Sequence, residues 1–297
     1  MKQFTKVGIV GYGSYVPEGR VKTNICSKAV AQADEDAATL AWEAATAALA
    51  LSKLAANKIG AVYIGSESHP YAVKPTATMV GEALGMGHDY LAADLEFACK
   101  AGTAGVQIIA AEVESGLIDY GLAIGSDVAQ ARPGDALEYT AGSGAAALIL
   151  GKDKRQWKAV LEYTGSYSSD TPDFWRRNGA VYPSHAGRFT GEPAYFKHVI
   201  EGTKRFFKAT GFSHDDFRYV VLHMPNGKFP RRAAKTLGIT DQQLSLGLVV
   251  DEIGNPYSAS SLIGLCRVLE QLKGGDRVLV TSYGSGSGSD SFSFKGV

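Results

Sequence analysis

Short apolar runs alternate with longer alanine-rich or amphipathic segments along most of the chain. Such runs are typical of buried strands, and the longer segments are typical of helices. We expect strands at residues 7–10, 59–64, 120–125, 145–150, 159–163, 219–222 and 277–282, with a short strand reaching residue 99 and another at the end. We expect helices at residues 37–51, 76–84, 193–210 and 255–273, and after residues 99 and 228. This alternation predicts the α/β class.

The first apolar run leads into a glycine pair, Gly11 and Gly13, that looks like the start of a dinucleotide-binding fingerprint. The third glycine of that fingerprint is missing, and Pro17 stands where the helix should already have begun. We therefore exclude a Rossmann-type site and expect residues 13–17 to form a surface loop.

The order of predicted elements repeats along the chain. The strand at 59–64 corresponds to the strand at 219–222, the helix after Cys99 corresponds to the helix at Asn255, and the strand at 120–125 corresponds to the strand at 277–282. We expect two similar halves, residues 1–165 and 166–297, that form one compact unit. A duplicated β-α arrangement would bring the ends of these strands together at one site.

Composition excludes several classes of function. Thirty basic and thirty acidic side chains balance, so no nucleic-acid or membrane partner is expected. No apolar run is long enough to span a bilayer. The three cysteines, Cys26, Cys99 and Cys266, are widely separated, which fits a reducing cytoplasm and argues against a disulfide framework or a zinc site. We expect a soluble cytoplasmic protein that holds no metal.

Cys99 is the first candidate for chemistry. It ends an apolar run and precedes a small-residue segment that leads into a helix. Unpaired backbone N–H groups and the positive end of a helix dipole favour a thiolate at such a position. The alternative is a buried structural cysteine, which is the commoner fate of this residue type.

Three polar residues follow predicted strands or open a predicted helix: Glu67, His223 and Asn255. Ligands of open α/β sheets bind at the carboxyl ends of the strands, where Glu67 and His223 lie. Taken alone, each has a simpler interpretation. Glu67 could be a solvated carboxylate, His223 a structural histidine, and Asn255 the cap of the helix that it opens.

An irregular, aromatic and charged stretch fills residues 170–188, and its length is typical of a functional loop. Near the C-terminus, a glycine–serine repeat spans residues 284–289. Apolar strands are predicted on both sides of the repeat, so we interpret it as a tight active-site turn rather than a linker.

Together these segments resemble the thiolase superfamily and, within it, the archaeal type of 3-hydroxy-3-methylglutaryl-CoA (HMG-CoA) synthase. The matching motifs occur in the family's order over nearly the whole chain: Gly65-Ser-Glu-Ser-His-Pro-Tyr71, Glu96-Phe-Ala-Cys-Lys-Ala-Gly-Thr-Ala-Gly105, Thr171-Pro-Asp-Phe-Trp-Arg-Arg177, Gly187-Arg-Phe-Thr-Gly-Glu-Pro-Ala-Tyr-Phe196, His223-Met-Pro-Asn-Gly-Lys228, Gly254-Asn255 and Ser282-Tyr-Gly-Ser-Gly286. The resemblance implies a thiolase fold in which two βαβ halves form a layered αβαβα core.

The resemblance also implies an acyltransferase that performs a Claisen-type condensation in the mevalonate pathway of isoprenoid synthesis. Acetyl-CoA would acylate Cys99, and Glu67 would remove a proton from the acetyl methyl group and later protonate the new alkoxide. His223 and Asn255 would hold acetoacetyl-CoA. A glutamate after the Gly-Ser pair favours this family over ketoacyl synthases and thiolases, which use histidine or a second cysteine as the acid–base group.

The resemblance assigns binding roles to several other groups. Lys228 matches a lysine that contacts CoA phosphate, and Arg231 and Arg232 could assist it. Backbone N–H groups of Cys99 and of the turn Gly284, Ser285 and Gly286 would stabilise oxyanions. CoA thioesters are substrates, so no cofactor is expected.

As partners, the resemblance implies a homodimer, and a complex with acetoacetyl-CoA thiolase and a small acyl-CoA-binding scaffold protein is a further possibility. The chain departs from the family in a shortened segment between Val21 and Asp34 and in ending at Val297 without the family's C-terminal extension. Two alternatives stay open: another thiolase-fold acyltransferase that forms a carbon–carbon bond, and a non-catalytic member that binds acyl-CoA or a partner.

Overall fold

The computed structural model describes residue 1 and residues 3–297, and in this part of the chain nine strands join into one mixed sheet. The helices are α1 (Ala37–Ser52), α2 (Thr76–Ala83), α3 (Ala101–Ser115), α4 (Phe196–Thr210), α5 (Lys228–Leu237), α6 (Asp241–Leu244), α7 (Val250–Ile253) and α8 (Ser260–Leu269). The strands of the sheet are β1 (Gly8–Tyr15), β4 (Ala61–Gly65), β5 (Leu91–Leu95), β6 (Tyr120–Asp127), β7 (Gly144–Gly151), β8 (Ala159–Ser168), β11 (Tyr219–Leu222), β12 (Arg277–Thr281) and β13 (Gly288–Gly296). Two short hairpins lie outside it, β2 (Arg20–Lys22) with β3 (Ser27–Ala29) and β9 (Phe174–Trp175) with β10 (Ser184–His185). The α/β class predicted from the sequence is confirmed.

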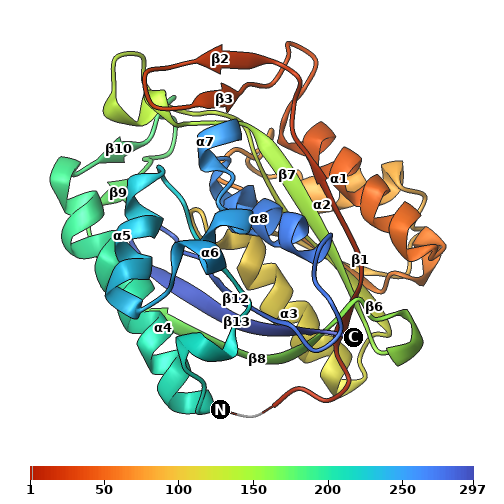
Figure 1. Cartoon of the computed structure of the whole chain (residues 1–297). Coiled ribbons are helices and arrows are strands. Elements are labelled where there is room, and N and C mark those ends of the chain that lie inside the picture. The colour runs from red at the N-terminus through yellow and green to blue at the C-terminus, as the bar shows by residue number, and fades with distance from the viewer. Residues whose placement is uncertain (2) are drawn as a thin grey trace.

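The sheet and its helices form a layered core. The strand order is β11-β12-β13-β8-β1-β7-β6-β4-β5, and β1 pairs with β8 where the two halves of the chain meet. Figure 1 shows α3 and α8 in the middle of the molecule, α1 and α2 beyond one part of the sheet, and α4 and α5 beyond the other. This arrangement agrees with the layered αβαβα core that the resemblance implies.

The strand order of the N-terminal part recurs in the C-terminal part. Strands β4 and β6 are parallel neighbours, as are β11 and β12, and each inner strand then pairs antiparallel with the next. The sequence predicted that the strand before Glu67 corresponds to the strand before His223. In the sheet, these two strands, β4 and β11, occupy equivalent positions. The predicted division after residue 165 falls within β8, and it stays a prediction.

The prediction of a surface loop at residues 13–17 is wrong for its first residues. Strand β1 continues to Tyr15, and Gly13 is buried within it. A Cβ atom at Gly13 would lie 2.5 Å from the carbonyl oxygen of Ala44, and one at Gly11 would lie 2.5 Å from that of Ala48. The two glycines therefore serve close packing of α1 on the strand rather than a turn.

Most other predicted elements are confirmed with small shifts at their ends. Helix α1 begins where the acidic residues suggested, because the Asp36 carboxylate accepts hydrogen bonds from the N–H groups of Ala38 and Thr39. The strand before Cys99 ends earlier, at Leu95. The last strand, β13, is long rather than short, and it begins inside the glycine–serine repeat. Of the helices in the described part of the chain, none has the length and apolar character needed to cross a membrane.

Candidate active site

Cys99 and Glu67 meet directly. The Cys99 Sγ atom donates a hydrogen bond of 2.9 Å to the Glu67 Oε1 atom. Glu67 follows β4, and Cys99 lies in the short segment between β5 and α3. A Cβ atom at Gly65 would lie 2.1 Å from the carbonyl carbon of Ala101, so only glycine lets the start of α3 approach β4 this closely. This close approach brings the thiol to the carboxylate.

Burial governs the protonation of both groups. Desolvation, together with the negative charge of Asp127, raises the pKa of Glu67 to about 8. Desolvation and the neighbouring Glu67 carboxylate raise the pKa of the Cys99 thiol well above its ordinary value. The sequence indicated a position where the helix dipole favours a thiolate, but burial and a close carboxylate outweigh the dipole, so the pKa of Cys99 is raised rather than lowered.

Asp127 holds the segment that carries Glu67. This fully buried carboxylate ends β6 and accepts hydrogen bonds from the Glu67 N–H (2.7 Å) and from the hydroxyl groups of Ser66 (2.9 Å) and Ser68 (2.7 Å). It also accepts the N–H of Ser258, which lies just before α8 (2.8 Å). Asp127 thus joins the Glu67 segment to the C-terminal part of the chain.

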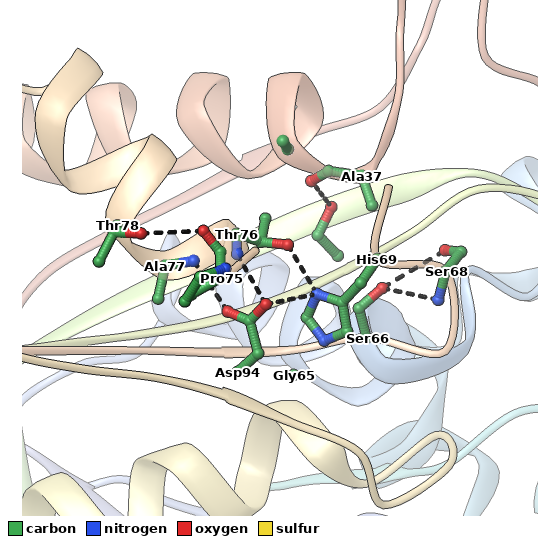
Figure 2. A network of polar contacts seen from close by, with 12 residues as sticks. Ala37, Gly65, Ser66, Ser68, His69, Pro75, Thr76, Ala77, Thr78 and Asp94 are labelled. Atoms are coloured by element: carbon green, nitrogen blue, oxygen red, sulfur yellow. Dashed lines mark hydrogen bonds and ion pairs between the residues drawn. The ribbon is translucent and has the colours of Figure 1, made fainter. Parts of the chain in front are cut away.

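A second polar network reaches the same segment at His69, two residues after Glu67 (Figure 2). The Asp94 carboxylate accepts the N–H groups of Thr76 (2.7 Å) and Ala77 (2.8 Å) at the start of α2. The Nδ1 atom of His69 lies 2.9 Å from the Thr76 hydroxyl and 3.3 Å from Asp94. A buried network at Asp127 and a partly buried one at Asp94 therefore hold residues 66–69 around Glu67.

Glu67 connects the buried thiol to an open pocket of about 450 Å³. Phe97, Arg176, Ser285 and Gly286 are among the other residues that line it. The Arg176 guanidinium donates to the carbonyl oxygen of Glu67 (2.6 Å) and to the side chain of Gln130. The irregular stretch at 170–188 thus contributes to the pocket through the β9–β10 hairpin, as its composition suggested.

His223 is buried and neutral. Its exposed fraction is 1%, and among the described residues neither ring nitrogen has a hydrogen-bond partner. Desolvation lowers the pKa of His223 to about 3. The segment is held through its backbone, where the Tyr195 hydroxyl donates to the His223 carbonyl (2.7 Å). Buried polar atoms are normally paired, so the two unpaired nitrogens are unusual. His223 does not line the 450 Å³ pocket, and its substrate-binding role stays a prediction.

Asn255 lies beside the residues that surround Cys99. It forms an isolated parallel bridge with Ala141, and its side-chain oxygen accepts the N–H of Tyr257. Ala141 and Tyr257 pack with Cys99 in one small apolar cluster. The contact with Tyr257 is what a local cap makes, so the substrate-binding role of Asn255 stays a prediction.

The structure separates Lys228 from this centre. Lys228 is exposed at the first position of α5 and does not line the 450 Å³ pocket. Arg231 forms an ion pair with Asp251, and Arg232 forms one with Glu192. Contacts of these three side chains with CoA stay predictions.

The glycine–serine turn lies at the pocket, as expected, but one of its amides is already engaged. The Gly284 N–H donates to the Gly288 carbonyl over 2.8 Å. Ser285 and Gly286 line the pocket. The predicted oxyanion role therefore rests on the amides of Cys99, Ser285 and Gly286.

Sequence reasoning missed Asp127 and Tyr257. Asp127 could have been found by the rule that identified Glu67, because it ends the strand next to β4 on the same edge of the sheet. Tyr257 gave no comparable signal, since only its packing beside Cys99 and Ala141 makes it part of the site.

Several known proteins resemble this chain closely in sequence. The chain is 54% identical to the hydroxymethylglutaryl-CoA synthase of Archaeoglobus fulgidus, over 97% of this chain and 89% of that protein. It is 53% identical to the hydroxymethylglutaryl-CoA synthase of Methanocaldococcus jannaschii, over 96% of this chain and 87% of that protein. Residues 207–295 match the family described as 3-oxoacyl-[acyl-carrier-protein] synthase III, C terminal.

Solved structures show the same fold. An HMG-CoA synthase complexed with CoA superimposes with a TM-score of 0.89, at 23% identity, over 99% of this chain and 83% of that chain. The 3-oxoacyl-(acyl carrier protein) synthase III of Pseudomonas aeruginosa superimposes with a TM-score of 0.88, at 23% identity, over 98% of both chains. The thiolase-type fold predicted from the sequence is therefore confirmed.

Proposed function

The chain belongs to the hydroxymethylglutaryl-CoA synthase family, and on that basis we propose that it condenses acetyl-CoA with acetoacetyl-CoA to give HMG-CoA and CoA. The observation that carries the proposal is the contact between the Cys99 thiol and the Glu67 carboxylate at the pocket. The reaction would supply the HMG-CoA of the mevalonate pathway.

Acylation begins when Glu67 takes the Cys99 proton across the 2.9 Å contact. Both groups have raised pKa values, so the transfer replaces one buried negative charge by another. The thiolate then attacks the thioester carbon of acetyl-CoA, the bond from that carbon to the CoA sulfur breaks, and CoA leaves with the proton that Glu67 returns. Cys99 now carries the acetyl group.

Condensation uses the same carboxylate. Glu67, ionised again, removes a proton from the acetyl methyl group, and the resulting carbanion attacks the ketone carbon of acetoacetyl-CoA. The neutral His223 ring can donate a hydrogen bond to the ketone oxygen, which becomes an alkoxide and takes the proton from Glu67. Water then cleaves the thioester to Cys99 and releases HMG-CoA.

The proposal extends to assembly. Strand β5 is at the edge of the sheet, and Leu91 at its start is 46% exposed, so a second copy can extend the sheet there. We propose a homodimer, with a thiolase and a small acyl-CoA-binding protein as further partners. Light scattering on the purified protein tests the homodimer. Co-purification from cells tests the complex with a thiolase and an acyl-CoA-binding protein.

Product analysis tests the proposed reaction. The protein is incubated with both thioesters, and the products are identified by mass spectrometry, with Cys99→Ser as the control. HMG-CoA from the wild type and none from the variant is the expected result. Acetylation without HMG-CoA would assign the chain to another acyltransferase reaction, and no acetylation of a folded protein would favour a non-catalytic role.

His223→Leu separates the two half-reactions. We expect this variant to accept an acetyl group on Cys99 but to form HMG-CoA at least about tenfold more slowly, because the ketone loses its hydrogen-bond donor. Intact mass measures the first step, and product formation measures the second. Equal loss of both steps would show that His223 acts before condensation.

A further inference from the structure

A buried ion pair lies directly behind the nucleophile. Lys100, the residue after Cys99, places its Nζ atom 2.9 Å from the Asp290 Oδ2 atom. The side chains are 5% and 0% exposed. Asp290 lies in β13, far along the chain, so the pair joins the segment that carries Cys99 to the C-terminal part of the sheet. Neither residue has a role in the reaction steps proposed above.

The Asp290 carboxylate is surrounded by donors from several elements. Besides Lys100, the hydroxyl oxygen of Thr103 in α3 lies 3.0 Å from Oδ2, and the hydroxyl group of Ser166 in β8 donates to Oδ1 over 2.8 Å. The Lys100 ammonium also lies 3.7 Å from the centre of the Phe97 ring, which lines the pocket. Lys100 therefore links the Phe97 ring, two residues before Cys99, to the Asp290 carboxylate of β13.

The same segment packs tightly against the glycine–serine turn. A Cβ atom at Gly284 would lie 2.5 Å from the Phe97 carbonyl oxygen and 2.9 Å from the Lys100 Cγ atom. The contact leaves no room for a side chain, so a small shift of residues 97–100 would also displace the turn.

From these contacts we propose that the Lys100–Asp290 ion pair is a positioning element, which fixes residues 97–100, and with them the Cys99 thiol, against the turn at residues 284–288. The inference deepens the proposed function and rests on it for its catalytic consequence. Lys100 does not touch the reacting atoms in this role. It acts by holding the nucleophile at the distance from Glu67 that proton transfer requires.

General energetics favour this role over a purely stabilising one. Removing two charges from water costs free energy that their attraction only partly returns, so a buried ion pair is a weak source of stability. The pair does restrict geometry, because Lys100 and Asp290 stay paired only while the segments that carry them keep their positions. A misplacement of about 1 Å can slow a reaction about a hundredfold.

The test compares Lys100→Met with the double variant Lys100→Met/Asp290→Asn. The single variant leaves a buried carboxylate unpaired and is expected to lower the melting temperature. The double variant removes both charges, so its melting temperature should return towards that of the wild type. Even so, the rate constant of Cys99 acetylation in the double variant should be ten- to a hundredfold lower than in the wild type. The final acetyl content should still reach one group per chain.

Arg277→Met is the matched control. Arg277 pairs with Glu162 in a partly buried contact, at 2.8 Å, between β12 and β8. This variant should lose stability while its acetylation rate stays within about twofold of the wild type. If the double variant acetylates Cys99 at the wild-type rate, the pair serves stability alone and the inference is overturned.

Hydrogen exchange gives a measure that needs no substrate. Amides in residues 97–103 and 284–288 should exchange faster in the double variant than in the wild type. In Arg277→Met their exchange rates should be unchanged. Should the wild type accept no acetyl group, the proposed function fails, and exchange alone decides the inference. Unchanged exchange in both segments would overturn it. The double variant also keeps the test available if Lys100→Met does not fold.

Discussion

Around Cys99, two carboxyl groups lie close to the buried thiol: Asp127 is fully buried, and Glu67 is partly exposed to the open pocket. Cys99 and Glu67 were candidates in the sequence, because one precedes a small-residue helix and the other follows a strand, but only the family resemblance favoured them over the simpler interpretations. Their charge states were not predictable from the sequence, because those depend on burial and on Asp127, which only the fold brings together. The helix dipole favours a thiolate at Cys99, but desolvation and the neighbouring Glu67 raise the pKa of the thiol instead.

The first prediction concerns the pH dependence of acetylation. Glu67 must be ionised to accept the thiol proton, so the rate should rise with pH towards about 8 and fall about tenfold for each unit well below it. The apparent pKa belongs to the coupled Glu67–Cys99 pair. Single-turnover acetylation measured from pH 6 to 9 gives the profile. A rate independent of pH over this range contradicts the role of Glu67 as the base.

Asp127→Asn tests the cause of that pKa. Removing the negative charge of Asp127 should lower the pKa of Glu67 and move the rising part of the rate profile to lower pH. Asn keeps the oxygen that accepts the Ser66 and Ser68 hydroxyl groups, so the Glu67 segment should keep its place, although the Ser258 N–H loses its acceptor. If the pH–rate profile of Asp127→Asn matches that of the wild type, desolvation alone causes the raised pKa of Glu67.

At the scale of elements, most helices and strands were predictable because their apolar patterns are long and regular. Strand β1 was predicted too short, since its glycines were interpreted as turn residues although they make room for α1. The early part of β13 was missed for a related reason. Glycine and serine have low strand propensity, and pairing with β8 decides their conformation there.

Gly13→Ala tests the packing of α1 on β1. The added methyl group would lie 2.5 Å from the Ala44 carbonyl oxygen, so α1 must shift, and the cost should be about 1–3 kcal/mol. Thermal or denaturant unfolding measures it. Gly274→Ala is the control, because its Cβ atom would have no neighbour closer than 3.5 Å. Equal stability of the two variants contradicts the packing argument.

At the scale of the whole molecule, the repeated order of elements was visible in the sequence. The exact contacts between the segments that it brings together were not. The rhythm predicted that the Glu67, Cys99, His223 and Asn255 segments would lie close together. The structure brings Cys99 to Glu67 and packs Ala141, the bridge partner of Asn255, beside Cys99. It leaves Lys228 at an exposed position of α5, because the place of that helix depends on packing that no local pattern specifies.

The site should also influence the stability of the whole fold. In the folded chain Glu67 keeps its proton up to about pH 8, whereas the unfolded carboxyl loses it near 4.5. The stability linked to the neutral form is therefore present below pH 4.5 and is lost as pH rises to 8. Glu67→Gln cannot ionise, so it should gain stability relative to the wild type over this range, by up to about 1.4 kcal/mol per pH unit. Urea unfolding at several pH values measures the difference, and a constant difference contradicts the raised pKa.

The most direct measurement is the intact mass of the purified protein after incubation with acetyl-CoA alone, alongside Cys99→Ser and Glu67→Gln. We predict that the wild type gains one acetyl group, that Cys99→Ser gains none, and that Glu67→Gln gains it at least a hundredfold more slowly at pH 8. A folded wild type that gains no acetyl group, or an acetyl group that still attaches to Cys99→Ser, would contradict the assignment of Cys99 as the nucleophile.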